Sequence, residues 1–324
     1  MKNKDDFEEL DDKYIYKLDN INFKPIFILG VERSGTSILY KILSKTNCFN
    51  IVSSYHVIKY KELLHNHINN IEEESKKNLQ NLFEKKSQFD RGIDRLKITP
   101  NFPEEYRFIL AQKADADHIN SKSISVFEEM CKKIQFISEN NKPILLKNPR
   151  DFTHSLTIKS LIPNSKFIFI HRHPIKTLSS QVRAMKSLLK NKSVYMSLVA
   201  PKYGQVFDNP ILLFYYRLLY SYLTPYRVLS ATNKLAKSTK TYLININQLN
   251  KKDFVYIKYE NLCKQPDLEI NKILDFLDLK PEHNISYNSF IKPRKTRQLK
   301  TIKLFERWIN RKLDEYISYL NYKK

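Results

Sequence analysis

The sequence predicts an α/β protein in which a parallel β-sheet carries helices on both faces, and two observations indicate this. Short apolar runs rich in β-branched and aromatic residues recur at 24–30, 143–147, 166–171 and 254–262, the last including a turn. Stretches with apolar residues at helical spacing separate these runs. Strands that alternate with helices in this way form parallel sheets with short, right-handed connections.

Length and composition favour one domain. The chain has 324 residues with 42% hydrophobic content, which is enough to bury a sizeable core as one large domain or two small ones. We predict a polar N-terminal extension over 1–22 and a single α/β domain over 23–324.

The first elements surround a phosphate-loop pattern. The strand at 24–30 ends at Gly30, and apolar residues at helical spacing resume after Thr36. Residues 57–92 are helix-like and heavily charged, which predicts a surface insertion. A helix is expected over 123–140 before the strand at 143–147.

The second half continues the alternation. The strand at 166–171 is followed by a helix that begins at Pro174, a favourable first helical residue. The aromatic segment 209–240 is helical with a break at Pro225, and 268–279 forms an amphipathic helix. A closing helix carries an apolar face made of Leu304, Trp308, Leu313, Ile317 and Leu320.

The formal net charge is +22, from 56 Lys and Arg against 34 Asp and Glu. Such a charge suits a polyanionic partner, but it also follows from a Lys, Asn and Ile bias of the whole composition. The basic residues are spread along the chain and form no nucleic-acid-binding signature, so no nucleic-acid partner is expected.

Cysteine usage and hydropathy bear on the compartment. Cys48, Cys131 and Cys263 are odd in number and far apart, which indicates neither a disulfide framework nor a zinc site. No run approaches the roughly 20 apolar residues that span a bilayer. We therefore expect a cytoplasmic protein without a transmembrane segment, with docking onto a membrane surface left open.

The segment GVERSGTS, residues 30–37, has the G-x-x-x-x-G spacing of a phosphate-binding loop, with Thr36 where that motif has its lysine. Backbone N–H groups and a helix N-terminus still suit an anion. The chain has only 4 glycines, and Gly30 and Gly35 stand in this loop. Ser37 keeps the final hydroxyl, and the cation of the loop is Arg33. A triphosphate fits less well, because nothing at Thr36 would hold the γ-phosphate.

The end of the strand at 166–171 points to a second anion. Enzymes that bind Mg²⁺ with such a loop place an Asp near the end of a neighbouring strand. Here the strand runs into His171, Arg172 and His173. We infer a metal-free nucleotide with two separated anionic groups, one at the loop and one near Arg172.

These segments resemble the sulfotransferases that use 3′-phosphoadenosine 5′-phosphosulfate (PAPS). The family's 5′-phosphosulfate loop reads R/K-S-G-T-[TS], which is matched here by Arg33, Ser34, Gly35, Thr36 and Ser37. The resemblance implies a P-loop NTPase-like parallel sheet, with these residues and Gly30 binding the co-substrate.

A second segment of the family has an apolar strand, then Arg-x-Pro, then a Ser eight residues after the Arg. Arg172, Pro174 and Ser180 match it, and the resemblance implies that Arg172 and Ser180 bind the 3′-phosphate. LLKNPR and its flanks look like the bacterial and carbohydrate or tyrosylprotein branches, and YENL at 259–262 resembles a late family segment. The late R-K-G triplet is missing, and Arg294, Lys295 and Arg297 could substitute.

For catalysis, the resemblance implies that Arg33 stabilises charge on the leaving phosphate. The proton acceptor is expected after the loop and its helix, where His56 stands, with Glu32 and Glu62 as competitors. Lys147, Asn148 and Arg150 would line the cleft, and His171 and His173 would lie near the nucleotide rather than the acceptor. Tyr259 and Glu260 are expected to form a structural corner.

Simpler roles stay open for several of these residues. Arg33 could pair with Glu32, Thr36 and Ser37 could cap their helix, and Arg172 could bridge to an acid. His56 could be a core or solvent-facing histidine.

The sequence thus predicts an enzyme that transfers a sulfuryl group from PAPS to a hydroxyl or amine acceptor, without metal. The resemblance favours a glycan or another carbohydrate-containing acceptor, and leaves the oligomeric state open. The alternatives are a P-loop kinase that uses ATP and Mg²⁺, and a non-catalytic polyanion-binding protein.

Overall fold

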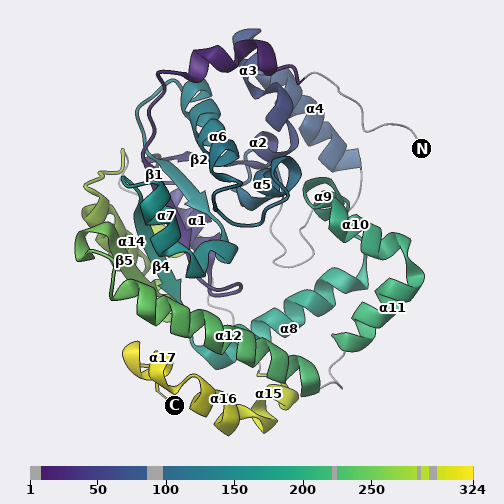
Figure 1. The fold of residues 1–324 in the computed structure, drawn as a ribbon, viewed down its shortest axis with the longest axis vertical. Helices are drawn as coiled ribbons and strands as arrows, with labels where there is room; N and C mark the ends of the chain where they lie inside the picture. The colour runs from purple at the N-terminus through teal and green to yellow at the C-terminus, as the bar shows by residue number, and fades with distance from the viewer. Residues whose placement is uncertain (1–8, 86–97, 221–224, 283–285, 292–297, 324) are drawn as a thin grey trace.

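A five-stranded, all-parallel sheet in the order β2-β3-β1-β4-β5 forms the centre of the molecule (Figure 1). The computed structural model describes residues 9–85, 98–220, 225–282, 286–291 and 298–323. The strands are β1 (Pro25–Leu29), β2 (Asn50–Ile51), β3 (Ile144–Lys147), β4 (Lys166–His171) and β5 (Phe254–Lys258). The α/β prediction is confirmed, and the strand that it missed is β2, whose two residues are too short to show a period.

The strand ends meet at one edge of the sheet. In the central pairs, Ile28 of β1 stands opposite Lys147 of β3 and Ile168 of β4. Gly30 and Asn148 therefore follow their strands at the same edge, and Arg172 follows β4 there too. This edge is where ligands bind in open α/β sheets.

Alternating residues of the strands build a core on each face of the sheet. On one face Ile26, Ile28 and Ile168 pack with α1 (Thr36–Leu43) and α14 (Pro266–Leu277). On the other face Phe27 and Phe167 pack with α6 (Ile124–Ile137), α7 (Ser155–Leu161) and α12 (Pro225–Ile246). Helices thus cover both faces, as the sequence predicts.

Residues 9–22, expected as a polar extension, pack onto the body. The turn η1 (Asp12–Leu18) lies against α6, and Leu18 is buried. Asp11 and Lys133 are both buried, with Asp11 Oδ2 and Lys133 Nζ 2.9 Å apart. This buried ion pair links the segment to α6, and removing either partner would leave an unpaired buried charge.

The charged insertion predicted over 57–92 also contributes to the core. Its described part, 57–85, forms η2 (Tyr60–Glu62), α3 (Leu63–Ile68) and α4 (Glu72–Lys85). Leu63, Leu79 and Phe83 are buried, so the polar composition of this stretch hides an apolar face. Residues 86–92 lie outside the described part of the chain.

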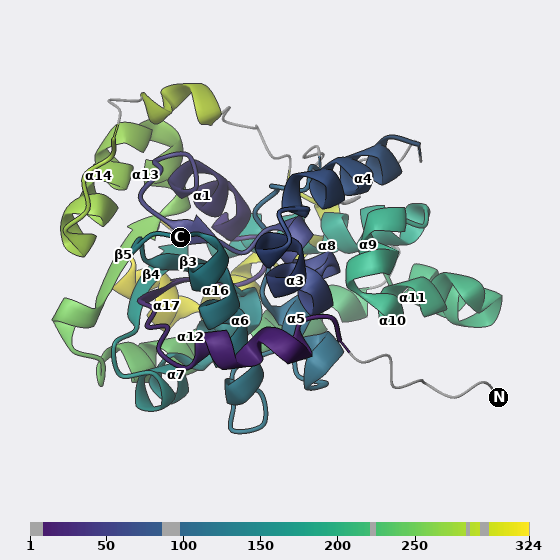
Figure 2. The same cartoon turned by 90° about the horizontal axis from the view of Figure 1, so that it is seen from above.

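The helices after β4 extend to the side of the molecule away from β5 and α14 (Figures 1 and 2). They are α8 (Pro174–Lys190), α9 (Val194–Val199), α10 (Pro201–Asp208) and α11 (Pro210–Leu219). The predicted break is confirmed, because α11 ends at Leu219 and α12 begins at Pro225.

The predicted closing helix is three short helices, α15 (Lys300–Leu304), α16 (Glu306–Lys312) and α17 (Asp314–Tyr319). The chain turns at Phe305 and Leu313, so Leu304 falls off the expected apolar face and is 79% exposed. Leu313, Ile317 and Leu320 are buried as expected.

The remaining elements are short: α2 (Ser54–Ile58), α5 (Arg107–Lys113), η3 (Pro149–Thr153), η4 (Lys251–Asp253), α13 (Tyr259–Lys264) and η5 (Tyr287–Phe290). Within the residues described above, no helix combines the length and apolarity that a membrane crossing needs.

Candidate active site

The loop between β1 and α1 has no room for side chains at its two glycines. A Cβ on Gly30 would lie 2.5 Å from the carbonyl oxygen of Ile170. Gly35 has a φ of 110°, and a Cβ there would lie 2.3 Å from the Tyr259 ring. The close packing of Tyr259 beneath the loop supports its expected structural role.

The loop presents hydrogen-bond donors to an anion. Gly35 caps α1 without a side-chain hydrogen bond, so the first N–H groups of the helix depend on other partners. Arg33 has a positive φ of 72°, which turns the backbone sharply just before Ser34. The hydroxyl of Ser34 is buried and has no hydrogen-bond partner among the described residues. An orphaned hydroxyl inside a glycine-lined loop fits an oxyanion.

Three predicted site residues from two motifs, 30–37 and 172–180, contact one another at this loop. Arg33 Nε donates to Ser180 Oγ on α8 at 3.2 Å, and Arg172 Nη1 donates to the Arg33 carbonyl oxygen at 3.2 Å. The Arg172 guanidinium lies 4.5 Å above the Tyr259 ring centroid. Arg172 is only 8% exposed, and its buried Nε lacks a hydrogen-bond partner in the described part of the chain. The guanidinium therefore retains donor capacity for a ligand.

A buried lysine from the neighbouring strand reaches the loop. Lys147, at the end of β3, donates from Nζ to Ser37 Oγ at 3.1 Å. The same Nζ lies 3.1 Å from Glu105 Oε1, and Glu105 also pairs with Arg107. Lys147 of β3 thus brings a cation to the loop that has no lysine at Thr36. The sequence analysis expects Lys147 only as a residue that lines the cleft.

Two adjoining cavities open beside the loop. The smaller, of about 200 Å³, is lined by Arg33, Thr36, Ser37, Glu105 and Arg107 among others. The larger, of about 550 Å³, is lined by loop residues, by η3 and by α12. Glu32, Pro149, Arg150 and Gln181 line both, so a group bound at the loop borders the larger cavity.

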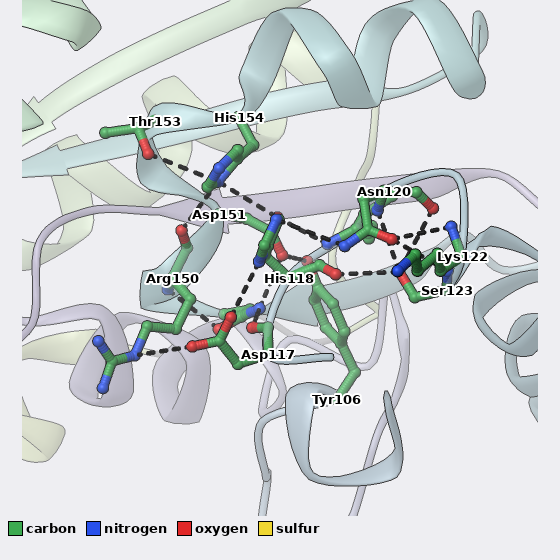
Figure 3. Close-up of polar contacts among 12 residues, drawn as sticks. Tyr106, Asp117, His118, Asn120, Lys122, Ser123, Arg150, Asp151, Thr153 and His154 are labelled. Atoms are coloured by element: carbon green, nitrogen blue, oxygen red, sulfur yellow. Dashed lines mark hydrogen bonds and ion pairs between the residues drawn. The ribbon is translucent and has the colours of Figure 1, made fainter. Parts of the chain in front are cut away.

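A stacked histidine pair lies in the wall of the larger cavity (Figure 3). The rings of His118 and His154 have centroids 4.3 Å apart with an interplanar angle of 17°. His118 Nδ1 lies 2.9 Å from Asp117 Oδ1, and a carboxylate only accepts, so Nδ1 carries the hydrogen. The neutral ring then presents a lone pair at Nε2, to which Asn120 approaches at 3.4 Å.

Asp117 is held as a carboxylate. Partial burial raises the pKa of Asp117, but the hydrogen bond from His118 and the charge of Arg150 outweigh burial and leave the pKa below its ordinary value. Arg150 Nε lies 3.9 Å from Asp117 Oδ2, while its Nη2 lies 3.0 Å from Glu32 Oε1. This guanidinium therefore links the histidine pair to the anion loop.

A buried hub fixes the position of this histidine-bearing segment. Asp151 of η3 is fully buried and accepts hydrogen bonds from the Tyr106 hydroxyl at 2.5 Å and the Ile119 N–H at 3.0 Å. Asn148, next to Lys147, donates to Asp151 Oδ2 at 2.7 Å and to the Asp117 carbonyl oxygen at 2.9 Å. The hub anchors residues 117–119 to the end of β3 (Figure 3).

His56 lies elsewhere. Its Nδ1 accepts from the Ser53 N–H at 3.2 Å and closes a capping box at the start of α2. Burial lowers the pKa of His56 to about 4, with the charges of Glu72 and Lys76 acting nearby. His56 lines neither of the two cavities beside the loop, so its role as the base stays a prediction.

His171, expected near the nucleotide, belongs to the core. It lies between the hydroxyls of Tyr316 and Tyr242, at 2.8 and 3.0 Å from its two ring nitrogens. Burial lowers its pKa to about 3, so the ring is neutral. Residues 167, 169 and 171 share one face of β4, and that face is covered by α12, which explains the position of His171.

The structure bears on Glu260 but not on the basic residues predicted at 294–297. Glu260 accepts from the His173 N–H at 3.1 Å and from the Tyr322 hydroxyl at 3.0 Å, which supports its expected structural role. Arg294, Lys295 and Arg297 lie outside the described residues. Among the residues that the structure does describe, no group of three His, Cys, Asp or Glu side chains is placed to hold a metal ion.

Comparison with known proteins gives the family. The sequence model described as the sulfotransferase family matches residues 25–283. The fold is similar to that of sulfotransferase STF9 from Mycobacterium avium, with a TM-score of 0.64 and 14% identity, covering 97% of this chain and 82% of that one. The fold is also similar to that of sulfotransferase STF1 from Mycobacterium tuberculosis H37Rv, with a TM-score of 0.59 and 12% identity, covering 94% of this chain and 80% of that one.

No curated protein sequence matches the chain significantly. Because the two mycobacterial proteins are only 14% and 12% identical to this chain, their structural likeness shows a shared fold and no more. The match to the family model covers well over half of the sequence and shows the family. The chain therefore belongs to the sulfotransferase family of enzymes.

Proposed function

We propose that the chain transfers a sulfuryl group from PAPS to a hydroxyl or amine of a carbohydrate-containing acceptor. The observation that carries this proposal is the convergence of Arg33, Arg172 and Ser180 at the glycine loop. The loop and Arg172 form two cationic positions on adjacent strand ends, which suits a nucleotide with anionic groups at both its 5′ and 3′ ends. PAPS supplies the activated sulfuryl group when bound.

In this proposal the loop N–H groups, Ser34 and Arg33 hold the 5′ end. Lys147 and Ser37 add a buried cation and a hydroxyl on the opposite side of the loop. Fixed donors in a poorly hydrated site stabilise developing negative charge without reorganisation, which is worth about 3–4 kcal/mol per donor in comparable sites. Arg172 and Ser180 hold the 3′-phosphate.

The larger cavity serves as the acceptor site. Its wall combines polar groups (Asp117, His118, Gln181, Ser230, Ser238) with the apolar surfaces of Phe152, Val182 and Tyr220. Hydroxyl-rich acceptors need this mixture of directed hydrogen bonds and flat apolar surface. The acceptor oxygen or nitrogen would then reach the loop past Glu32 and Arg150.

We assign the proton acceptor to His118. Its Nδ1 is fixed by Asp117, so its Nε2 is the basic nitrogen, and the segment that carries it is anchored through Asn148 to the end of β3. Imidazole is the side chain whose ordinary pKa suits proton abstraction near neutrality. The three free cysteines fit the reducing cytoplasm that we expect.

A thermal-shift titration followed by a transfer assay tests this function. Purified protein is heated with 3′-phosphoadenosine 5′-phosphate (PAP), with ADP, and with ATP plus Mg²⁺. A ligand present at 100 times its Kd stabilises the native state by about 2.7 kcal/mol. We expect PAP alone to stabilise, and radiolabelled PAPS to deposit sulfate on a polysaccharide mixture. Stabilisation by ATP with Mg²⁺ in place of PAP would overturn the proposal in favour of a kinase.

A further inference from the structure

Helix α11 carries large apolar side chains that are more than half exposed. None of its residues is buried. Ile211, Phe214, Tyr215 and Leu218 are 82%, 69%, 54% and 55% exposed, and we call these four residues the α11 stripe. Their spacing of three, four and seven residues places them on one side of the helix. Both views place α11 at the periphery of the molecule (Figures 1 and 2).

Positive charge borders the α11 stripe. Residues 183–227 contain seven Lys and Arg and a single acidic residue, Asp208. Arg217 of α11 donates from Nε and Nη2 to the carbonyl oxygens of Leu189 and Lys190, at 2.9 and 3.1 Å. The exposed Lys190 at the end of α8 therefore lies beside the helix, and Asp208 is already paired with Lys192 at 2.5 Å.

We propose that the α11 stripe docks onto a membrane surface that carries anionic lipid headgroups. Apolar side chains would enter the acyl boundary, while Arg217 and Lys190 would contact the headgroups. Tyr215, Tyr216 and the 63% exposed Tyr226 have the amphipathic rings that favour the interface between water and lipid. The ten residues of α11 are too few to span a bilayer, so the helix would lie along the surface.

The charge argues for lipid over a second copy of the chain. Pairing two copies through the α11 stripe would bring two basic borders together, and like charges repel. Anionic headgroups would instead neutralise these borders. The larger cavity lies near the C-terminal end of α11, because Tyr220, directly after α11, and Arg227, near the start of α12, both line that cavity.

Vesicle flotation tests the docking surface independently of any transfer reaction. The probes are phosphatidylcholine vesicles with and without 30% phosphatidylglycerol, at low and high NaCl. The test variant is Ile211→Asp with Phe214→Asp. The matched control is Leu268→Asp with Leu304→Asp, which changes the net charge by the same amount as the test variant. These two leucines lie on α14 and α15 and are 57% and 79% exposed.

We expect the wild type and the control to bind vesicles that contain phosphatidylglycerol, and the test variant to bind at least tenfold more weakly. High salt should weaken all binding, and vesicles of phosphatidylcholine alone should bind little. Thermal melting of the test variant should match the wild type, because the stripe is exposed. The proposal is overturned if the wild type ignores anionic vesicles, if the control loses as much binding as the test variant, or if both vesicle types bind equally. A dimer in light scattering that the test variant abolishes would assign the stripe to a second copy instead.

Discussion

The nucleotide side and the acceptor side of the proposed active site are built in different ways. On the nucleotide side, two short motifs, 30–37 and 172–180, contribute nearly every group, and their residues contact one another directly. On the acceptor side, the cavity is assembled from loops 114–120 and 149–154 and from α8 and α12. The comparison teaches that the anion cradle is a local property of the sequence, whereas the acceptor site depends on tertiary packing.

The largest effect should come from the tight loop. Gly35→Ala forces a Cβ against the Tyr259 ring at a backbone conformation that disfavours side chains. We expect a loss of about 2–4 kcal/mol in the free energy of unfolding and no measurable PAP binding. Urea denaturation and calorimetry measure the two quantities. Gly204→Ala is the control, since its Cβ would meet only side-chain atoms, Ser197 Oγ at 3.3 Å, Ser197 Cβ at 3.4 Å and Lys192 Cε at 3.9 Å, and it should change stability by less than about 1 kcal/mol.

The acceptor side is tested by comparing two histidines. If His118 is the base, His118→Gln should lower kcat by about 10²–10³-fold with PAP affinity unchanged. PAP release from PAPS with an acceptor present measures the rate. A comparable loss of kcat in His56→Gln, with His118→Gln active, would restore His56 as the base.

The third effect is the dependence of stability on pH that comes from His171, at the end of β4. His171 has a folded pKa of about 3 against an ordinary 6.5, so below pH 6.5 the unfolded chain binds a proton that the folded chain excludes. Its contribution to stability is present above pH 6.5 and falls by about 2 kcal/mol by pH 5. Urea denaturation across this range should show a shallower pH slope for His171→Gln. Equal slopes in both proteins would contradict a buried neutral ring.

The smallest effect concerns the cation that replaces the motif's lysine. Lys147→Met removes the ammonium group that contacts Ser37, and we expect roughly tenfold weaker PAP binding, about 1.4 kcal/mol. Lys142→Met, just before β3, removes an ammonium that pairs with Glu282 at the surface and should leave the affinity unchanged. Calorimetry measures both. Identical affinities for the two variants would remove Lys147 from the nucleotide side.

The sequence singles out the residues of the proposed nucleotide side because they lie within nine residues of one another in each motif, and the structure brings Arg33, Arg172 and Ser180 together. Four of the five strands follow from apolar runs, and β2 is missed because it has only two residues. His171 is misplaced by the sequence analysis, although the alternation of residues 167, 169 and 171 along one face carries the signal for burial.

The acceptor side could not be predicted in the same way. Asp151 lies 45 residues after Tyr106 and 32 residues after Ile119, and only the folded chain joins the three residues into a hub. His118 has no motif around it, and its proposed role as the base rests on the hub that anchors its segment and on the stacked His154. Tertiary hydrogen bonds of this kind leave no periodic signal in a sequence.

The most direct test of the central claim compares PAP with AMP, which lacks the 3′-phosphate, by calorimetric titration. The account predicts that the wild type binds PAP at least 100-fold more tightly than AMP, because Arg172 and Ser180 hold the 3′-phosphate. Arg172→Ala should reduce this ratio below tenfold and leave AMP binding unchanged, while Arg183→Ala, on the helix α8 that follows Arg172, should keep the ratio. Equal binding of PAP and AMP by the wild type, or a ratio that survives Arg172→Ala, would contradict the assignment of two anion positions.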